Sequence, residues 1–275
     1  MTIGEFNSKF RSDLNELYSP REVLSLFKIV MEEFLSSDIT KFYLKPDYKL
    51  TNIELEKINN FTNKLKRGVP YQYILGETNF YDYKFYVNNN VLIPRIETEG
   101  LVDWVLNDNN NSRKIVFDFC SGSGCIAITT KIKRKKWNVF ALENSKKAIQ
   151  LAKINSLRHS AKINYINADI FSWNKYKEID IVISNPPYVL ESQKKNIKKN
   201  VLNFEPEKSI FVSDKNPLVF YKRIFDISKL KLKEGGLIYF EINPKFKNLL
   251  ISLSKKYKFS NYESKKDIFK RNRYI

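Results

Sequence analysis

The chain contains little cysteine and histidine, and it has no long apolar run. Its 275 residues include 2 cysteines and 1 histidine, too few for a disulfide framework or a conventional zinc site, so we expect no metal. No stretch approaches the roughly 20 apolar residues of a membrane span, and the first residues lack the basic head and apolar body of a signal peptide. These absences predict a cytoplasmic protein without a membrane partner.

Basic residues are in large excess. The formal net charge is +18, which is compatible with a nucleic-acid-binding protein. However, the lysines are dispersed, with only modest clusters at 131–136 and 194–199, and Lys, Asn, Ile, Phe and Tyr are abundant throughout, as expected of an AT-rich genome. We therefore favour a positive surface suited to an acidic protein or a ribosome-associated partner over sequence-specific nucleic-acid binding.

The first 67 residues are predicted to form a small helical domain. The stretch Ser19-Pro20-Arg21-Glu22 combines an N-cap serine, a proline at the first helical position and a glutamate two residues later. The stretch Thr51-Asn52-Ile53-Glu54 repeats the capping pattern, and its helix should end at Gly68 after a basic last turn. Apolar residues at helical spacing follow both caps, and we expect them to form the core of this domain.

Residues 68–96 and 97–275 show two other patterns. Within 68–96, the aromatic stretch 80–87 alternates like a short hairpin, so this segment should link two domains. A helix is expected from about Glu97 to Leu106, after which strands and helices alternate in the doubly wound α/β pattern. The predicted strands are 114–119, 138–142, 162–167, 179–184 and 236–242, with a terminal pair near 257–262 and 268–275.

The stretch 180–188, Asp-Ile-Val-Ile-Ser-Asn-Pro-Pro-Tyr, is the most informative part of the sequence. Its β-branched half predicts a strand buried on both faces, and the two prolines force the chain out of the sheet at Asn185. Asn185, Pro186, Pro187 and Tyr188 should therefore lie at the carboxyl end of a central strand, where open α/β sheets bind ligands. The long segment from Val189 to Asn216 that follows is expected to act as a lid.

A nucleoside-binding pattern precedes this stretch. The strand 114–119, which carries Asp118 near its end, leads into the turn 120–125, Cys-Ser-Gly-Ser-Gly-Cys. A helix follows, and then a second strand that ends in Glu143. Glycines let the backbone of a turn approach a ligand. A carboxylate about 20 residues further along the chain can accept hydrogen bonds from ribose hydroxyls. Because the third glycine of the dinucleotide motif is missing, NAD binding is not favoured. Both cysteines are interpreted as small residues packed near the ligand.

Together, the acidic strand end, the glycine turn, Glu143, Asp169 and the Asn-Pro-Pro-Tyr turn resemble class I S-adenosylmethionine-dependent methyltransferases. More specifically, the chain resembles the HemK-type protein-(glutamine-N5) methyltransferases that modify peptide release factors. It runs from about Gly68 to the C-terminus. The further matches are 92–99 (Leu-Ile-Pro-Arg-Ile-Glu-Thr-Glu), 204–206 (Phe-Glu-Pro), 235–237 (Gly-Gly-Leu) before Glu241, Asp267 and Arg273.

The resemblance implies a seven-stranded Rossmann-like catalytic domain over 97–275, S-adenosyl-L-methionine as cofactor, class 1 release factors as partners of the helical domain, and a monomer. The implied catalytic residues are Asn185, Pro186 and Tyr188. The implied substrate-binding residues are these three together with Pro187, Arg95 and Glu99. The implied cofactor residues are Asp118, Cys120, Ser121, Gly122, Ser123, Gly124, Glu143, Asp169, Ile170 and Asn185.

Two departures and two alternatives stay open at this stage. Cys120 and Ser121 stand where many members carry Gly-Thr, which the turn tolerates if Cys120 keeps a negative φ. The segment 243–246, Asn-Pro-Lys-Phe, replaces a common glycine and glutamine pattern, so the family pattern does not predict the conformation of this loop. The alternative activities are N6-adenine DNA methylation, which uses the same turn on a flipped base, and glutamine methylation of a ribosomal protein.

Overall fold

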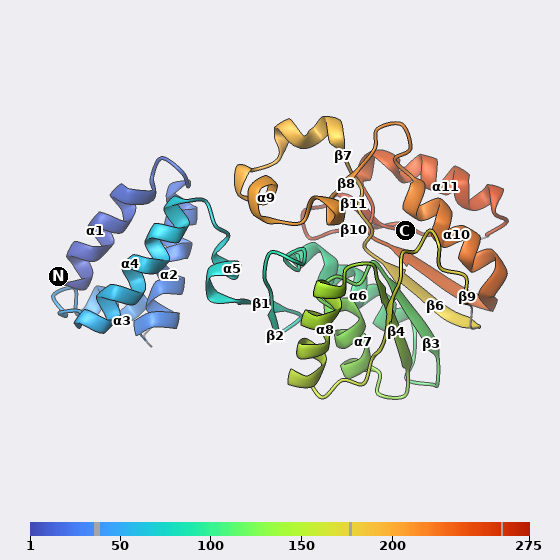
Figure 1. Ribbon diagram of the computed structural model, residues 1–275, viewed down its shortest axis with the longest axis horizontal. Helices are drawn as coiled ribbons and strands as arrows, with labels where there is room; N and C mark the ends of the chain where they lie inside the picture. The colour runs from blue at the N-terminus through green and yellow to red at the C-terminus, as the bar shows by residue number, and fades with distance from the viewer. Residues whose placement is uncertain (36–38, 176–177, 260) are drawn as a thin grey trace. The chain divides into compact units, whose positions relative to one another are not determined.

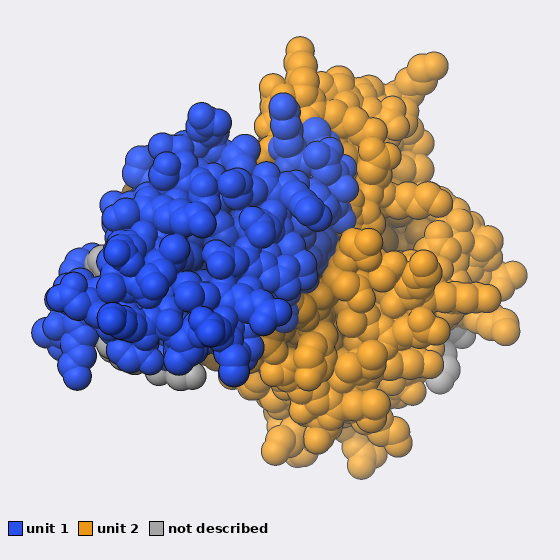
Figure 2. Space-filling model, turned by 60° about the vertical axis from the view of Figure 1, so that its left-hand side comes forward, with its two compact units in different colours: residues 1–75, 199–204 blue, residues 76–198, 205–275 orange. Residues whose placement is uncertain are grey.

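A computed structural model of the chain describes residues 1–35, 39–175, 178–259 and 261–275, and these form two compact units (Figure 2). The helical unit comprises residues 1–75 and 199–204, and the α/β unit comprises residues 76–198 and 205–275. In the described part of the chain, no helix is long and apolar enough to cross a membrane.

The helical unit contains the helices expected from its capping patterns. Glu22 and Ser19 exchange the predicted hydrogen bonds at the start of α2, and Thr51 and Glu54 form a complete capping box on α4. Gly68 follows α4 with a φ of +79°, as its position after the basic turn predicted. Apolar side chains from α1, α2 and α4 form one core. The helices are α1 (Ile3–Leu14), α2 (Pro20–Leu35), α3 (Ile39–Leu44), α4 (Asn52–Lys66), α5 (Tyr71–Leu75) and α9 (Lys199–Phe204).

The α/β unit begins with the predicted hairpin. Strands β1 (Glu77–Phe80) and β2 (Tyr83–Tyr86) pair antiparallel, and the turn between them places Tyr81 and Asp82 at positive φ. Phe80 and Phe85 are fully buried and pack edge to face, with ring centroids 6.0 Å apart. This buried aromatic pair anchors the hairpin on the core of the unit.

The core of this unit is a sheet of five parallel strands in the order β5-β4-β3-β6-β9, whereas the sequence predicted seven strands; in the described residues β10 and β11 pair separately. Alternate residues of each strand face opposite sides, so Val116 joins one hydrophobic cluster and Phe117 the other. The helices α6, α7 and α8 cover one face, whereas α10 and α11 cover the other (Figure 1). The strands are β3 (Ile115–Phe119), β4 (Asn138–Glu143), β5 (Asn164–Asn167), β6 (Ile179–Ser184) and β9 (Leu232–Phe240), and the helices are α6 (Ile96–Asp108), α7 (Cys125–Lys133), α8 (Lys146–Arg158), α10 (Val219–Lys231) and α11 (Lys247–Lys256).

The C-terminal pair of strands differs from the prediction. The described residues of 257–262 form no strand, because α11 ends at Lys256 and Lys258 and Asn261 adopt positive φ. Instead β10 (Lys265–Lys266) pairs antiparallel with β11 (Asn272–Tyr274). The backbone of Ile275 exchanges hydrogen bonds of 2.7 and 3.1 Å with Phe240, so the chain end runs antiparallel beside the end of β9.

The segment after the Asn-Pro-Pro-Tyr turn is folded. It starts with β7 (Val189–Leu190), which pairs parallel with β8 (Phe211–Val212), and the residues between them contain η1 (Glu191–Asn196), α9 and η2 (Glu207–Ser209). The pairing of β7 with β8 brings the beginning and the end of this segment together. Whether this segment moves as a lid stays a prediction.

Candidate functional site

The Asn-Pro-Pro-Tyr turn leaves the sheet at its carboxyl edge, as predicted. Strand β6 lies between β3 and β9, and its last residue, Ser184, is in register with Phe119 and Phe240. The Ser184 hydroxyl donates to the Phe119 carbonyl at 2.6 Å, which fixes the strand end just before the turn. Pro186 and Pro187 are buried, whereas Asn185 and Tyr188 are half-buried. The turn is therefore restricted in its backbone by two buried prolines, and the side chains on either side of them are partly exposed.

A buried hydrogen-bond network lies directly behind Asn185. Its Nδ2 donates to Thr98 Oγ1 at 3.0 Å, and the Thr98 hydroxyl donates to Glu241 Oε2 at 2.6 Å. Thr98 stands in the first turn of α6, and Glu241 follows β9. Among the described residues, none donates a hydrogen bond to Asn185 Oδ1, so this carbonyl oxygen is available to an incoming donor.

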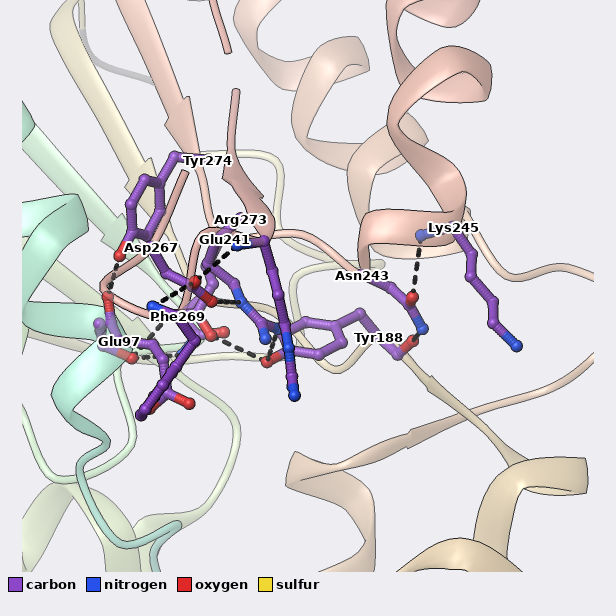
Figure 3. A network of polar contacts seen from close by, with 12 residues as sticks. Glu97, Tyr188, Glu241, Asn243, Lys245, Asp267, Phe269, Arg273 and Tyr274 are labelled. Atoms are coloured by element: carbon purple, nitrogen blue, oxygen red, sulfur yellow. Dashed lines mark hydrogen bonds and ion pairs between the residues drawn. The ribbon is translucent and has the colours of Figure 1, made fainter. Parts of the chain in front are cut away.

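Tyr188 belongs to the same network. Its hydroxyl donates to Glu241 Oε1 at 2.8 Å and accepts from the Arg273 guanidinium at 3.3 Å, and Figure 3 shows the three side chains converging. Arg273 Nε also pairs with Asp267 at 3.1 Å. Burial, followed by the nearby Glu241 carboxylate, raises the pKa of Tyr188 well above its usual value. Tyr188 is thus a neutral hydroxyl held at a fixed orientation.

The segment 243–246 supports this turn. The Asn243 side chain accepts from the Lys245 amide at 3.1 Å, which starts the short helix η3 (Pro244–Phe246), and its Nδ2 donates to the Tyr188 carbonyl at 3.3 Å (Figure 3). The departure from the family pattern is therefore a capped turn that holds the backbone of Tyr188.

The glycine turn does not meet the condition under which it was expected to tolerate Cys120 and Ser121. Cys120 has a positive φ, of +62°. The chain must reverse direction immediately after Phe119 to enter the turn, and the Ser121 amide then bonds the Leu142 carbonyl at 3.2 Å. A side chain in this left-handed region costs on the order of 1 kcal/mol. Gly124 also has a positive φ, of +81°, and begins α7.

Asp118 lies under this turn and is fully buried. Its Oδ2 accepts from the Ser121 hydroxyl at 2.8 Å and from the Ala127 amide at 3.2 Å, so it ties the turn to the start of α7. In the described part of the protein, Oδ1 has no hydrogen-bond partner. Burial, with a smaller effect of Glu143, raises the pKa of Asp118 to about 7.

The other predicted cofactor residues surround the same edge. Glu143 Oε2 accepts from the Gly122 amide, and its Oε1 accepts from the Ser145 amide, both at 2.9 Å. Asp169 is exposed and accepts from the Phe171 amide at 3.0 Å, whereas Ile170 is buried in the core. Ser123 is buried, and its carbonyl accepts from the Asn155 side chain. The predicted acids therefore lie at the ends of β3 and β4 and after β5.

Arg95 and Glu99, predicted to bind substrate, have other partners. Arg95 forms a 2.5 Å ion pair with Glu205, and the same carboxylate accepts from the Ile93 amide at 3.1 Å. Glu99 accepts from the Tyr81 amide at 3.0 Å and so holds the hairpin turn. In the described chain neither side chain bonds the turn 185–188. A role in substrate binding stays a prediction for both.

No metal centre can be assigned to the described residues, since they contain no cluster of three or more histidine, cysteine or acidic side chains. His159 packs within the α/β unit: its Nε2 lies 2.8 Å from the Lys84 carbonyl, and its ring packs against Tyr83 and Phe85.

Sequence reasoning did not assign site roles to Thr98, Glu241, Asp267 and Arg273. All four lie in segments that carry the family resemblance, but their spacing along the chain spans 175 residues and indicates no contact. A chemical signal could have found two of them. Thr98 lies at the start of a helix of the core and Glu241 directly after a central strand, so both side chains are expected to be buried and to need hydrogen-bond partners.

Comparison with known proteins identifies two regions. Residues 98–207 match the family model "Methyltransferase small domain", and residues 8–76 match the model "PrmC N-terminal domain". These matches fall mostly in the α/β unit and the helical unit, respectively.

Two similar sequences match over nearly their whole length. The release factor glutamine methyltransferase of Flavobacterium psychrophilum is 38% identical over 100% of this chain and 98% of its own. That of Bacteroides thetaiotaomicron is 34% identical over 99% of both chains. Among solved structures, a methyltransferase from Pyrococcus furiosus matches with a TM-score of 0.52 at 12% identity, over 82% of this chain and 96% of its own, which shows a shared fold.

Proposed function

Because the chain belongs to the release factor glutamine methyltransferase family, we propose that it methylates a glutamine side chain of peptide chain release factors with S-adenosyl-L-methionine as the methyl donor. The acceptor is N5 of the glutamine in the Gly-Gly-Gln motif of class 1 release factors. The observation that supports this activity best is the Asn185 side chain, whose Nδ2 is bonded to Thr98 and whose Oδ1 is available at the sheet edge.

The residues at the ends of β3 and β4 fit the cofactor. A Cβ at Gly122 would meet no atom within 4 Å, so a ligand can approach the backbone there. Asp118 offers a buried oxygen without a partner, which suits the amino group of the methionine part. Glu143 uses each oxygen for one amide, and its remaining lone pairs can accept from ribose hydroxyls. Asp169 and Ile170 would border the adenine. When bound, the cofactor supplies an electrophilic methyl group on a sulfonium sulfur.

The acceptor nitrogen needs help from the protein. An amide nitrogen is a poor nucleophile because its lone pair is conjugated with the carbonyl. Asn185 Oδ1 and the Pro186 carbonyl would each accept one hydrogen of the glutamine NH2, and Pro187 has no N–H to compete for that carbonyl. These two bonds enrich the nitrogen and fix its orientation. Alignment of two bound reactants can lower a barrier by about 7–11 kcal/mol.

Tyr188 completes the acceptor site in this proposal. Its hydroxyl is engaged by Glu241 and Arg273, so its ring is the part left to pack against the glutamine amide and exclude water. The Pro186 and Pro187 rings, which are buried, would limit the site to a planar group.

The helical unit is proposed to dock the release factor. It has its own core and two complete caps, so its surface can be presented to a partner without distortion. The excess of positive charge, +18 over the whole chain, suits an acidic partner. We expect the enzyme to act as a monomer in the cytoplasm, without sequence-specific nucleic-acid binding.

The test is incubation of the protein with labelled S-adenosylmethionine and, separately, with release factor, ribosomal protein and DNA. We expect label on the release factor glutamine, located by mass spectrometry. Asn185→Ala should leave the capture of release factor largely intact and lose turnover, since it removes an acceptor needed in the reacting geometry. Label on adenine or on a ribosomal protein, with release factor unmodified, would overturn the proposal.

A further inference from the structure

Three side chains from distant segments form a linear chain of hydrogen bonds that ends at the acceptor site. Asn185 bonds Thr98 at 3.0 Å, and Thr98 bonds Glu241 at 2.6 Å. Thr98 is 3% exposed and Glu241 is 1% exposed, so the bond between these two side chains is shielded from solvent. All three residues of this hydrogen-bond chain belong to the α/β unit.

The chemistry of these groups fixes the direction of each bond. The Thr98 hydroxyl donates its single hydrogen to Glu241 Oε2, and the other carboxyl oxygen accepts from the Tyr188 hydroxyl. Thr98 Oγ1 can then only accept from Asn185, which must present its NH2 and not its carbonyl. The Asn185 carbonyl is consequently directed away from Thr98, on the side where an acceptor is needed.

The second oxygen of Glu241 is fixed in the same way. Arg273 only donates, so the Tyr188 hydroxyl accepts from Arg273 and must use its own hydrogen for Glu241 Oε1. Arg273 is held by Asp267, which also accepts from the amides of Phe269 and Arg271 (Figure 3). The C-terminal segment 267–273 thereby sets the hydrogen-bond direction on one side of Glu241, and Thr98 sets it on the other.

From this geometry we infer that Thr98 and Glu241 are positioning residues that determine which end of the Asn185 amide faces the acceptor. A reversed Asn185 would present an N–H to a substrate that itself offers N–H groups, and the two would repel. This inference deepens the proposed function and rests on it for its catalytic consequence, whereas the orientation of the amide is a property of the free protein.

The experiment compares Thr98→Val, Thr98→Ser and Glu241→Gln with Thr130→Val as a matched control. Valine keeps the shape of threonine but can neither accept from Asn185 nor donate to Glu241, whereas serine can do both. Glutamine at 241 places an NH2 where one of the two hydroxyls now donates. Thr130 is a fully buried threonine of α7 whose hydroxyl bonds only helix carbonyls. For each variant we would measure cofactor affinity, and kcat and KM for release factor. We would also record the side-chain amide signals of Asn185 in ¹⁵N-labelled protein, which are assigned by their loss in Asn185→Asp.

We expect Thr98→Val and Glu241→Gln to lower kcat about 10- to 100-fold, the size of loss that follows when a partner that orients a metal-ligating side chain is removed. Cofactor affinity and KM should change less than threefold. The hydrogen-bonded amide proton of Asn185 should move upfield in Thr98→Val and stay in place in Thr98→Ser, which should retain kcat. Thr130→Val should change only the stability.

An unchanged Asn185 signal or an unchanged kcat in Thr98→Val would overturn the inference, as would an equal loss of kcat in Thr98→Ser. If Thr98→Val does not fold, Glu241→Gln and Thr98→Ser decide the same question. If the wild-type protein methylates no release factor, the proposed function fails, but the amide signals still test the orientation.

Discussion

Replacement of Asp118 by asparagine should make the cofactor-free protein more stable at pH 8. Asp118 is fully buried, and Oδ1 lacks a partner within the described residues. Asparagine can keep the bonds from the Ser121 hydroxyl and the Ala127 amide through its carbonyl oxygen, and it carries no charge at any pH. The variant therefore removes a buried charge while leaving the support of the glycine turn in place.

The size of the effect follows from the pKa of Asp118. That pKa is about 7 in the folded protein, against about 4 in an unfolded chain. Between these values the unfolded chain has already lost the proton that the folded chain keeps, so the free energy of unfolding falls as pH rises from about 4 to 7 and then levels off. The full difference is on the order of 4 kcal/mol. The unpaired NH2 of asparagine costs about 1–3 kcal/mol, which leaves a gain of about 1–3 kcal/mol at pH 8.

The assay is urea unfolding of the wild type and Asp118→Asn between pH 5 and pH 8, without cofactor. The two curves of stability against pH should converge and then cross as pH falls, because Asp118 becomes neutral. Asp180→Asn is the control, since the Asp180 carboxylate is paired with Lys233 at 3.1 Å and bonds the Ile115 amide, so this variant should lose stability at pH 8.

Parallel curves for the wild type and Asp118→Asn would refute the reasoning, because they would mean that Asp118 is no harder to ionise in the fold than in the unfolded chain. A second measurement addresses the cofactor. If Asp118 receives the amino group of S-adenosylmethionine, Asp118→Asn should bind it more weakly at pH 8, and an unchanged affinity by calorimetry would remove Asp118 from the cofactor site.

Three further outcomes are expected. Glu143→Ala should weaken S-adenosylmethionine binding by roughly 1–3 kcal/mol, since a charged acceptor is lost; calorimetry measures this, and equal affinities would contradict the ribose role. Cys120→Gly should be more stable in urea than Cys120→Ala by about 1 kcal/mol, because only alanine is strained at a φ of +62°; equal stabilities would count against that backbone conformation. Arg95→Ala should lower stability by up to about 3–5 kcal/mol, since it leaves the buried Glu205 carboxylate unpaired; unchanged melting with a raised KM for release factor would instead favour substrate binding.

The sequence alone predicted the elements whose cause is local. The capping boxes at Thr51 and Ser19, a short hairpin and a parallel central sheet depend on neighbouring residues and on periodicity. The structure contains all three, although the hairpin strands span 77–80 and 83–86 and not 80–87. The position of Asn185 at a strand end was also predictable, because two prolines cannot continue a central strand. Its catalytic role stays a prediction.

Only the tertiary structure decided which side chains meet. The expected strand at 257–262 was wrong because the last strand pairs by long-range backbone contacts beside β9, and local composition does not specify that partner. The left-handed φ of Cys120 follows from where β3 and β4 lie relative to the turn. Likewise, Thr98, Asn185 and Glu241 come together only because α6, β6 and β9 converge at one edge of the sheet. The direction of each hydrogen bond depends on every partner in this series of contacts. Because those partners are separated by up to 143 residues, the fold and not the sequence pattern determines the direction.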